Sequence, residues 1–181
     1  MTVGIKTDGS KGYIDLTTTT NYINNQKLGK FGFVCVVRLF DDVAQDARVM
    51  SYELADAASH QIIYDLANQK FEGEIFATEN FNAVAAHTAR KTVKVIMAFD
   101  GTSIGYITTA GSKKTFTPGQ DSYTTIEVGQ TDFVRLGARA YSLVNNSEMV
   151  FGGFFIMNLT SETIDATWIQ GLADELVLLD K

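Results

Sequence analysis

The sequence has few residues that break or cross-link a chain. Its 181 residues include one proline, Pro118, and one cysteine, Cys35. A single cysteine excludes an intrachain disulfide, and a single proline leaves no candidate for a proline-rich linker. Cys35 lies in the apolar run FGFVCVVRLF. We expect a buried, unreactive thiol there, because a reactive cysteine needs an electropositive and partly exposed setting.

Long hydrophobic runs and clusters of positive charge are also missing. No apolar run approaches the roughly 20 residues of a membrane helix, and the N-terminus MTVGIKTDGSKGY lacks the apolar core of a secretory signal. We therefore expect a chain that is made in the cytoplasm and stays soluble. The net charge of −6 and the scattered Lys and Arg residues argue against nucleic acid or an anionic membrane as a partner.

The sequence does contain many short stretches in which apolar residues alternate with others. Hydrophobic residues make up 45% of the chain, and no composition shift marks a boundary, so we expect one domain over 1–181 with an N-terminal arm at 1–11. Turn residues every 8–12 positions are typical of an all-β sandwich or barrel. The expected strands are Tyr13–Leu16, Phe31–Phe40, Ala47–Leu54, Gln61–Leu66, Glu74–Thr78, Thr92–Phe99, Ile104–Thr108, Thr125–Val128, Phe133–Ala140 and Val150–Leu159.

The C-terminal segment LTSETIDATWIQGLADELVLLD has helical spacing instead. Apolar residues recur every three or four positions and predict a helical segment at 161–180 with one apolar face. We expect Thr160 or Ser161 to cap it and Gly171 to be able to divide it. The apolar positions are Ile164, Trp168, Leu172, Leu176 and Leu179, and we expect Trp168 to pack in the core.

Two strands have apolar residues on both faces, which a half-solvated sheet does not show. In Phe31–Phe40, the residues Phe31, Phe33, Cys35, Val37 and Leu39 alternate with Val34, Val36 and Phe40. In Met149–Leu159, strict alternation places Met149, Phe151, Phe155, Met157 and Leu159 opposite Val150, Phe154 and Ile156. We expect the C-terminal helix, loops or another protein to cover the second faces.

Two dipeptides suggest hairpin turns, Asn68-Gln69 and Asp100-Gly101. Asp-Gly is favoured in type I′ turns because both central residues need positive φ.

The segment KTVKVIMAFDGTSIGYITTAG around Asp100-Gly101 resembles the central hairpin of laminin-G-like domains in the concanavalin A-like lectin/glucanase superfamily. GYIDLTTTTNYI is similar to the opening strand of such domains, and MVFGGFFIMNLTSETI to their closing strand and helix start. The resemblance covers 12–180 and implies a jelly-roll of two packed antiparallel sheets. It does not imply one function, since lectins, glycosidases, lyases and structural modules share the fold.

Catalytic residues are hard to assign from the sequence. Glu72 and Glu74 alternate onto one strand face, but Ala77 stands where the E-x-D-x-x-E pattern of the superfamily's glucanases places its last glutamate, and Glu79 lies on the other face. We interpret the pair as a solvated strand face without two-carboxylate chemistry. The two histidines, His60 and His87, are interpreted as structural. We therefore predict no catalytic residue.

Loops supply the other candidate sites. Asp41, Asp42 and Asp46 are carboxylates of the kind that Ca²⁺ takes, and the resemblance implies calcium at loop rims, although a solvated acidic loop is favoured. No other cofactor is expected. Tyr123, Tyr141, Asn145 and Asn146 could line a shallow carbohydrate site, with aromatic and amide groups around the sugar.

These observations favour a non-catalytic binding or structural module. Our main hypothesis is a bacteriophage virion accessory protein, such as a capsid decoration, fibre or tail component, that docks on other virion proteins or forms a homo-oligomer. The alternative is a lectin or adhesin that recognises a surface glycan. A polysaccharide-cleaving enzyme is the third hypothesis.

Overall fold

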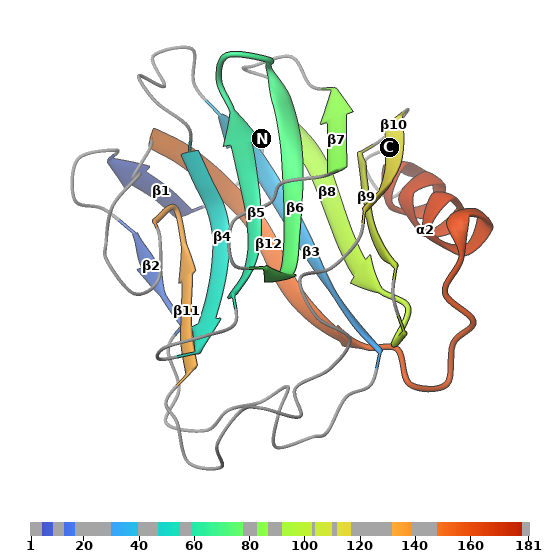
Figure 1. The fold of residues 1–181 in the computed structure, drawn as a ribbon. Helices are drawn as coiled ribbons and strands as arrows, with labels where there is room; N and C mark the ends of the chain where they lie inside the picture. The colour runs from blue at the N-terminus through green and yellow to red at the C-terminus, as the bar shows by residue number, and fades with distance from the viewer. Residues whose placement is uncertain are drawn as a thin grey trace.

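The protein is an antiparallel β-sandwich in a computed structural model (Figure 1). The structure describes residues 5–8, 13–16, 30–39, 47–54, 59–77, 83–86, 92–102, 104–109, 112–116, 132–138 and 148–178. Two six-stranded sheets, named sheet A and sheet B, pack face to face. This arrangement confirms the predicted two-sheet jelly-roll with a short C-terminal helix.

Each sheet combines strands from distant parts of the chain. Sheet A has the order β1 (Ile5–Asp8), β12 (Glu148–Asn158), β3 (Phe31–Leu39), β8 (Thr92–Phe99), β9 (Gly105–Thr109) and β10 (Ser112–Phe116). Sheet B has the order β2 (Ile14–Asp15), β11 (Asp132–Leu136), β4 (Ala47–Leu54), β5 (Ser59–Asp65), β6 (Lys70–Ala77) and β7 (Ala83–Ala86).

The space between the sheets holds the main hydrophobic core. Every second residue of β3, from Phe31 to Leu39, points inward and is fully buried. Cys35 is one of them, which confirms the expected buried thiol, and burial raises its pKa. Residues of sheet B complete this core, among them Met50, Tyr52, Ile62, Tyr64, Phe71, Ile75, Val134 and Leu136.

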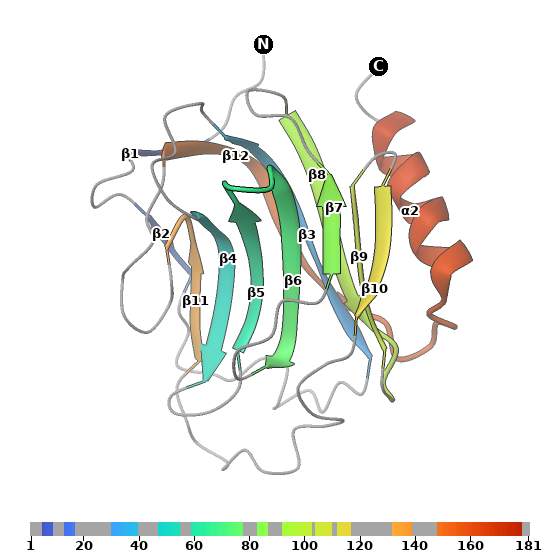
Figure 2. The same ribbon diagram turned by 45° about the horizontal axis from the view of Figure 1, so that its top comes forward.

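A second, smaller core lies on the outer side of sheet A. The helix α2 (Ala166–Leu178) covers β8, β9 and β10 there, as Figure 2 shows. Trp168 is partly buried against this core, as expected. The buried members are Val34, Ile96, Ala98, Tyr106, Leu159, Ile164, Ile169 and Ala173. Among the described residues, no helix is long and apolar enough to cross a membrane.

The helix begins later than the sequence suggests. Asp165 is its N-cap, because the Asp165 Oδ1 atom accepts hydrogen bonds of 2.8 Å from both Thr167 N and Trp168 N. The prediction of Thr160 or Ser161 as the cap was therefore wrong. The helix also runs unbroken through Gly171, so this residue does not divide it.

A β-bulge in β12 overturns the expected faces of that strand. The register with β3 shifts between Phe151 and Gly153, which inserts one extra residue. Phe154 and Ile156 therefore pack on the core between the sheets, with Phe151. Phe155 and Met157 lie on the outer face, so strict alternation was wrong to group them with Met149 and Phe151.

Three strands were not predicted. β7 has the sequence AVAA and β10 the sequence SKKTF, and neither shows a run of alternating apolar residues. β1 lies in the segment expected to be an arm, and it pairs with β12 from Ile5 to Asp8. The predicted strand Thr125–Val128 lies outside the described residues.

The two predicted hairpins form, but one turn differs from its prediction. Asn68 and Gln69 lie in the β5–β6 turn, where Gln69 has φ 52°. Gly101 has φ 85°, whereas Asp100 does not have positive φ, so the type I′ prediction was wrong. Asp100 instead closes a longer loop, because its Oδ1 atom accepts hydrogen bonds from Thr102 N at 2.8 Å and Ile104 N at 3.0 Å.

The two glycines Gly101 and Gly171 should respond oppositely to the same substitution. Gly101→Ala places a Cβ on a left-handed residue and should lower the free energy of unfolding by about 1 kcal/mol. Gly171→Ala, inside α2 with no atom within 4 Å of the added Cβ, should raise it by about 0.5–1 kcal/mol. Urea denaturation of both variants measures the difference, and an unchanged Gly101→Ala stability would contradict the loop geometry.

Candidate functional site

Sheet B carries a row of polar side chains on the side turned away from sheet A. Neighbouring strands align Asp15 with Arg135, Arg135 with Ser51, Ser51 with Gln61, and Gln61 with Glu74. One polar residue from each of five strands therefore lies in one line across the sheet. We call this line, together with Arg48 and Glu72 beside it, the polar face.

One end of the polar face is accessible to solvent. The Asp15 side chain is 41% exposed, and its Oδ2 atom lies 3.2 Å from the Nε atom of Arg135, which donates a hydrogen bond to it. The Arg135 guanidinium also lies 5.2 Å from the ring centroid of Tyr13, within cation–π range. A charged group is thus held beside a partly exposed aromatic ring at the β2 edge.

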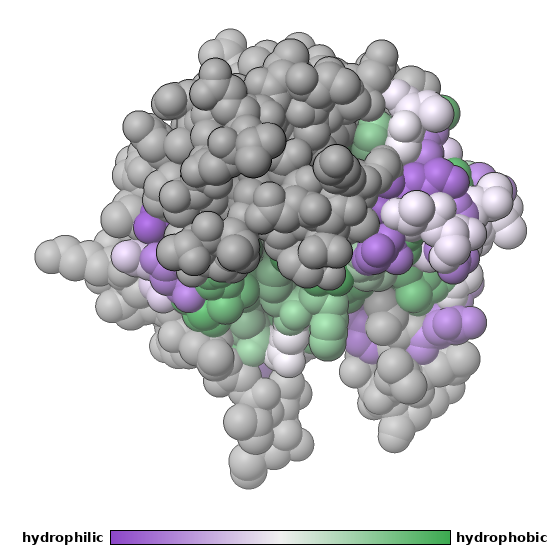
Figure 3. All heavy atoms as spheres, turned by 90° about the horizontal axis from the view of Figure 1, so that it is seen from below, coloured by the Kyte–Doolittle hydropathy of each residue, from purple (hydrophilic) through white to green (hydrophobic). Residues whose placement is uncertain are grey.

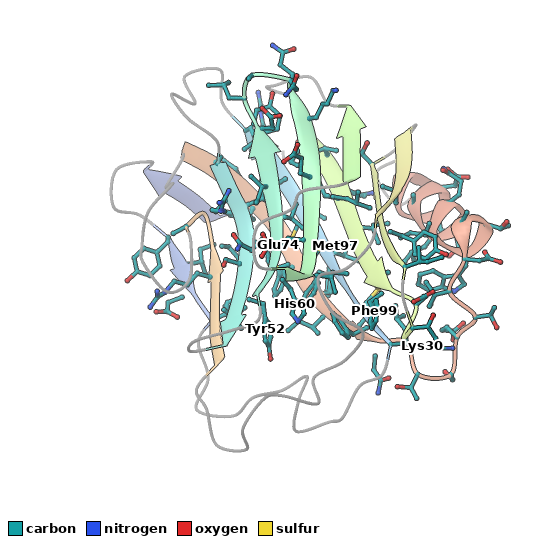
Figure 4. All side chains as sticks on the ribbon, viewed as in Figure 1. Lys30, Tyr52, His60, Glu74, Met97 and Phe99 are labelled. Atoms are coloured by element: carbon teal, nitrogen blue, oxygen red, sulfur yellow. The ribbon has the colours of Figure 1, made fainter. Side chains whose placement is uncertain are left out.

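The other end of the polar face is buried and incompletely hydrogen-bonded. Gln61 Nε2 donates to Glu74 Oε1 at 3.4 Å, and the two residues are 2% and 4% exposed (Glu74 is labelled in Figure 4). The Gln61 Oε1 atom is buried without a hydrogen-bond partner. Such an acceptor has a desolvation penalty that a bound donor would remove.

The chemistry of this face suits recognition of a hydroxyl-rich ligand. Arginine donates, carboxylates accept, and a glutamine side chain does both, so together they match hydroxyl groups that also donate and accept. Among the described residues, no cluster of three His, Cys, Asp or Glu side chains is arranged to hold a metal ion.

The loop residues predicted as sites cannot be compared with this face. Tyr123, Tyr141, Asn145 and Asn146 lie outside the described residues. The same holds for the possible calcium ligands Asp41, Asp42 and Asp46. These assignments stay predictions.

Glu72 and Glu74 do share one face, as their alternation indicated, and Glu74 is a member of the polar row. Their nearest cross-strand partners are Ile63 and Gln61, neither of them a carboxylate.

His60 lies inside the sandwich, on the opposite side of sheet B from the polar face. Its ring centroid is 4.9 Å from that of Phe31, 5.9 Å from that of Phe33 and 5.8 Å from that of Tyr52. Figure 4 shows it near Tyr52 at the lower end of the sheet. Burial lowers the pKa of His60 from 6.5 to about 3. His87 lies outside the described residues.

Sequence reasoning missed Arg48, Ser51, Gln61 and Arg135. Each is a polar residue with an apolar neighbour in its strand, and such a residue needs a partner once the strand is buried. Polar residues placed among apolar ones were the feature of the sequence that could have indicated this face. The bulge between Arg48 and Met50 hid part of it, because it shifts the alternation of β4.

Comparisons with known proteins give likeness of fold. No protein-family model and no curated protein sequence matches the chain. The CBM40 module of IT-sialidase from Ruminococcus gnavus, solved with bound alpha2,3 sialyllactose, matches with a TM-score of 0.67 and 11% identity. The match covers 94% of this chain and 95% of that module.

Sialidases contain a similar domain within longer chains. Trypanosoma rangeli sialidase, in complex with 2,3-difluorosialic acid, matches with a TM-score of 0.67 and 13% identity over 94% of this chain. NanB sialidase from Streptococcus pneumoniae matches with a TM-score of 0.63 and 12% identity over 93% of this chain. The chain spans 27% of the length of each of these sialidases. The shared fold is a two-sheet β-sandwich, compatible with the concanavalin A-like resemblance.

The buried His60 should make the fold acid-sensitive. Between pH 6.5 and about 3 the unfolded chain binds a proton at His60 and the folded chain does not. The free energy of unfolding should therefore fall as the pH is lowered through this window, by up to about 1.4 kcal/mol per pH unit from this residue. Urea titrations at several pH values measure the slope. His60→Leu should show a shallower slope than the wild type, and equal slopes would contradict the assignment.

Proposed function

We propose that the protein is a non-catalytic glycan-binding module and that the polar face of sheet B contacts the sugar. The observation that carries the proposal is the polar row across five strands, on a fold that matches a carbohydrate-binding module over nearly the full length of both chains. This supports the lectin hypothesis from the sequence more than docking on virion proteins.

The accessible β2 edge offers the two kinds of contact that a sugar needs. Asp15 presents an exposed carboxylate, and Arg135, whose side chain is 12% exposed, reaches the surface beside it. Tyr13 presents a partly exposed ring for the apolar face of a pyranose. The neighbouring Leu16 is 39% exposed and extends the apolar surface. The ligand would thus enter at this edge, with Ser51 and Gln61 along the row behind it.

The arrangement of carboxylates favours binding over hydrolysis. Glycosidases place two carboxyl groups about 5–9.5 Å apart across the bond they cleave. Asp15 and Glu74 stand at opposite ends of the row, four strand spacings or about 19 Å apart. Glu72 lies two residues from Glu74 on the same face, but Glu74 is 4% exposed and hydrogen-bonded to Gln61, so we assign no acid–base pair to this face.

Two finer assignments are outside this proposal. The role in a bacteriophage virion stays a prediction from the sequence, because no feature of the polar face bears on it. Calcium binding by Asp41, Asp42 and Asp46 also stays a prediction. Neither is required for the polar face to bind a glycan.

Replacing Arg135 should weaken glycan binding. Arg135→Gln removes the charged donor at the accessible edge, and a charged hydrogen bond of this kind corresponds to about a tenfold loss in affinity or more. A glycan array identifies the best ligand, with 3′-sialyllactose and lactose included, and calorimetry then measures the affinity of the wild type and the variant.

Arg38→Gln is the matched control, since Arg38 is an exposed arginine on the outer face of sheet A. It makes the same change of charge and should leave the affinity unaltered. Equal losses in both variants would point to a nonspecific charge effect. A wild-type protein that binds no glycan on the array would overturn the proposed function.

A further inference from the structure

Strand β12 has an open edge along its second half. β1 pairs with it only from Glu148 to Phe151, whereas β3 pairs with it as far as Asn158. In the part of the chain that the structure describes, no strand lies on the β1 side of Gly153–Asn158, as Figure 1 shows. We call Gly153–Asn158 the open edge segment.

The open edge segment is apolar on both sides of the sheet. Phe154 and Ile156 reach the rim of the core between the sheets and are only partly buried. Phe155 points outward and is 59% exposed, the most of any large hydrophobic residue described. Figure 3 shows hydrophobic side chains gathered across this lower end of the sandwich.

Among the described residues, neither α2 nor the side chains of the segment itself protect this edge. α2 packs over β8, β9 and β10, on the far side of β3 from the open edge segment. Proteins usually protect an open edge with lysine, proline or a covering element, because free N–H and C=O groups pair readily with another strand. The segment GFFIMN contains no proline and no charge.

We propose that the open edge segment pairs antiparallel with the same segment of a second copy of this chain. Sheet A of one subunit would then continue into sheet A of the other across a two-fold axis. The inference is independent of glycan binding, because the polar face lies on sheet B.

The segment is complementary to itself in one register. Residues that lie opposite one another in an antiparallel pair point to the same face of the sheet. At the two-fold axis, a residue must therefore lie opposite its own copy and not opposite its neighbour in the sequence. An axis at Phe155 places Phe155 opposite its own copy and Phe154 opposite Ile156 of the other subunit. Both apolar faces then meet apolar faces, and Met157 does not obstruct the pairing, because its side chain lies over Gly32 of β3 and packs against the core under α2. This fit favours a second copy over an unrelated strand.

The first test is the mass of the full chain in solution. Sedimentation over a wide concentration range should show a monomer–dimer equilibrium. Phe155→Lys should weaken dimerisation by about tenfold or more, because it removes the apolar contact at the axis and places two like charges directly opposite each other. Ile104→Lys is the matched control, since Ile104 is 38% exposed at the β8–β9 loop, and it should leave dimerisation unchanged.

The second test reads the register. Phe155→Cys should form a disulfide-linked dimer under mild oxidation, because opposite Cα atoms in an antiparallel pair lie about 4.5–5.5 Å apart. Met157→Cys should not, since the two copies of this position would be about 14 Å apart. The native Cys35 is fully buried and should not react in either variant.

Three results would overturn the proposal. One is a monomer at every concentration. A second is a dimer that Phe155→Lys and Ile104→Lys affect equally. A third is protection from hydrogen exchange, in the monomer, of those amides of the open edge segment that do not bond to β3. The chain would then cover its own edge.

Discussion

The burial of the inward face of β3 is the constraint on which the structure depends. Its inward residues fill the space between the sheets, and the outward Val34 lies beneath the core under α2. At about 25 cal/mol per Å² of apolar surface, a strand with five fully buried inward side chains contributes a large share of the stabilisation. Sheet B packs on the inward face of this strand, and α2 packs over the outer face of sheet A, where Val34 joins the second core.

The connection from β12 to α2 is held by hydrogen bonds to Lys30, the residue that precedes β3. Leu159 N donates to the carbonyl of Lys30 at 3.1 Å, and the Lys30 Nζ atom donates to the carbonyl of Glu162 at 2.7 Å. These contacts hold the chain where it turns from sheet A toward the outer face, and Asp165 then starts the helix. The position of the helix thus follows from the position of β3.

Much of the fold follows from local alternation, and the failures have local causes. The strands Ala47–Leu54 and Thr92–Phe99 match their predicted bounds. Thr92–Phe99 is rich in β-branched residues, which strongly favour a strand. Alternation fails at the bulge after Phe151, where one added residue inverts the faces. It also fails for β7 and β10, which are held by pairing with neighbours and carry little pattern of their own.

The polar face could be predicted only in part. Each member is visible in the sequence as a polar residue in an apolar strand, but the row exists because five strands share one register. Asp15 and Arg135 are 120 residues apart in the chain and meet through the pairing of β2 with β11. No local pattern encodes that pairing. Loop aromatics and acidic clusters can be recognised from residue type alone, whereas the polar row depends on how the strands pair.

The pairing of β3 with β12 has a consequence for the order of folding. Phe31 is matched to Asn158, so β3 gains its second neighbour only after residue 158 has been synthesised. Contacts between such distant residues form slowly, because a long loop must close first. A nascent chain that has completed β8 can already pair it with β3, but the other edge of β3 must wait. Until β12 emerges from the ribosome, this apolar edge is the part of the chain most in need of a chaperone.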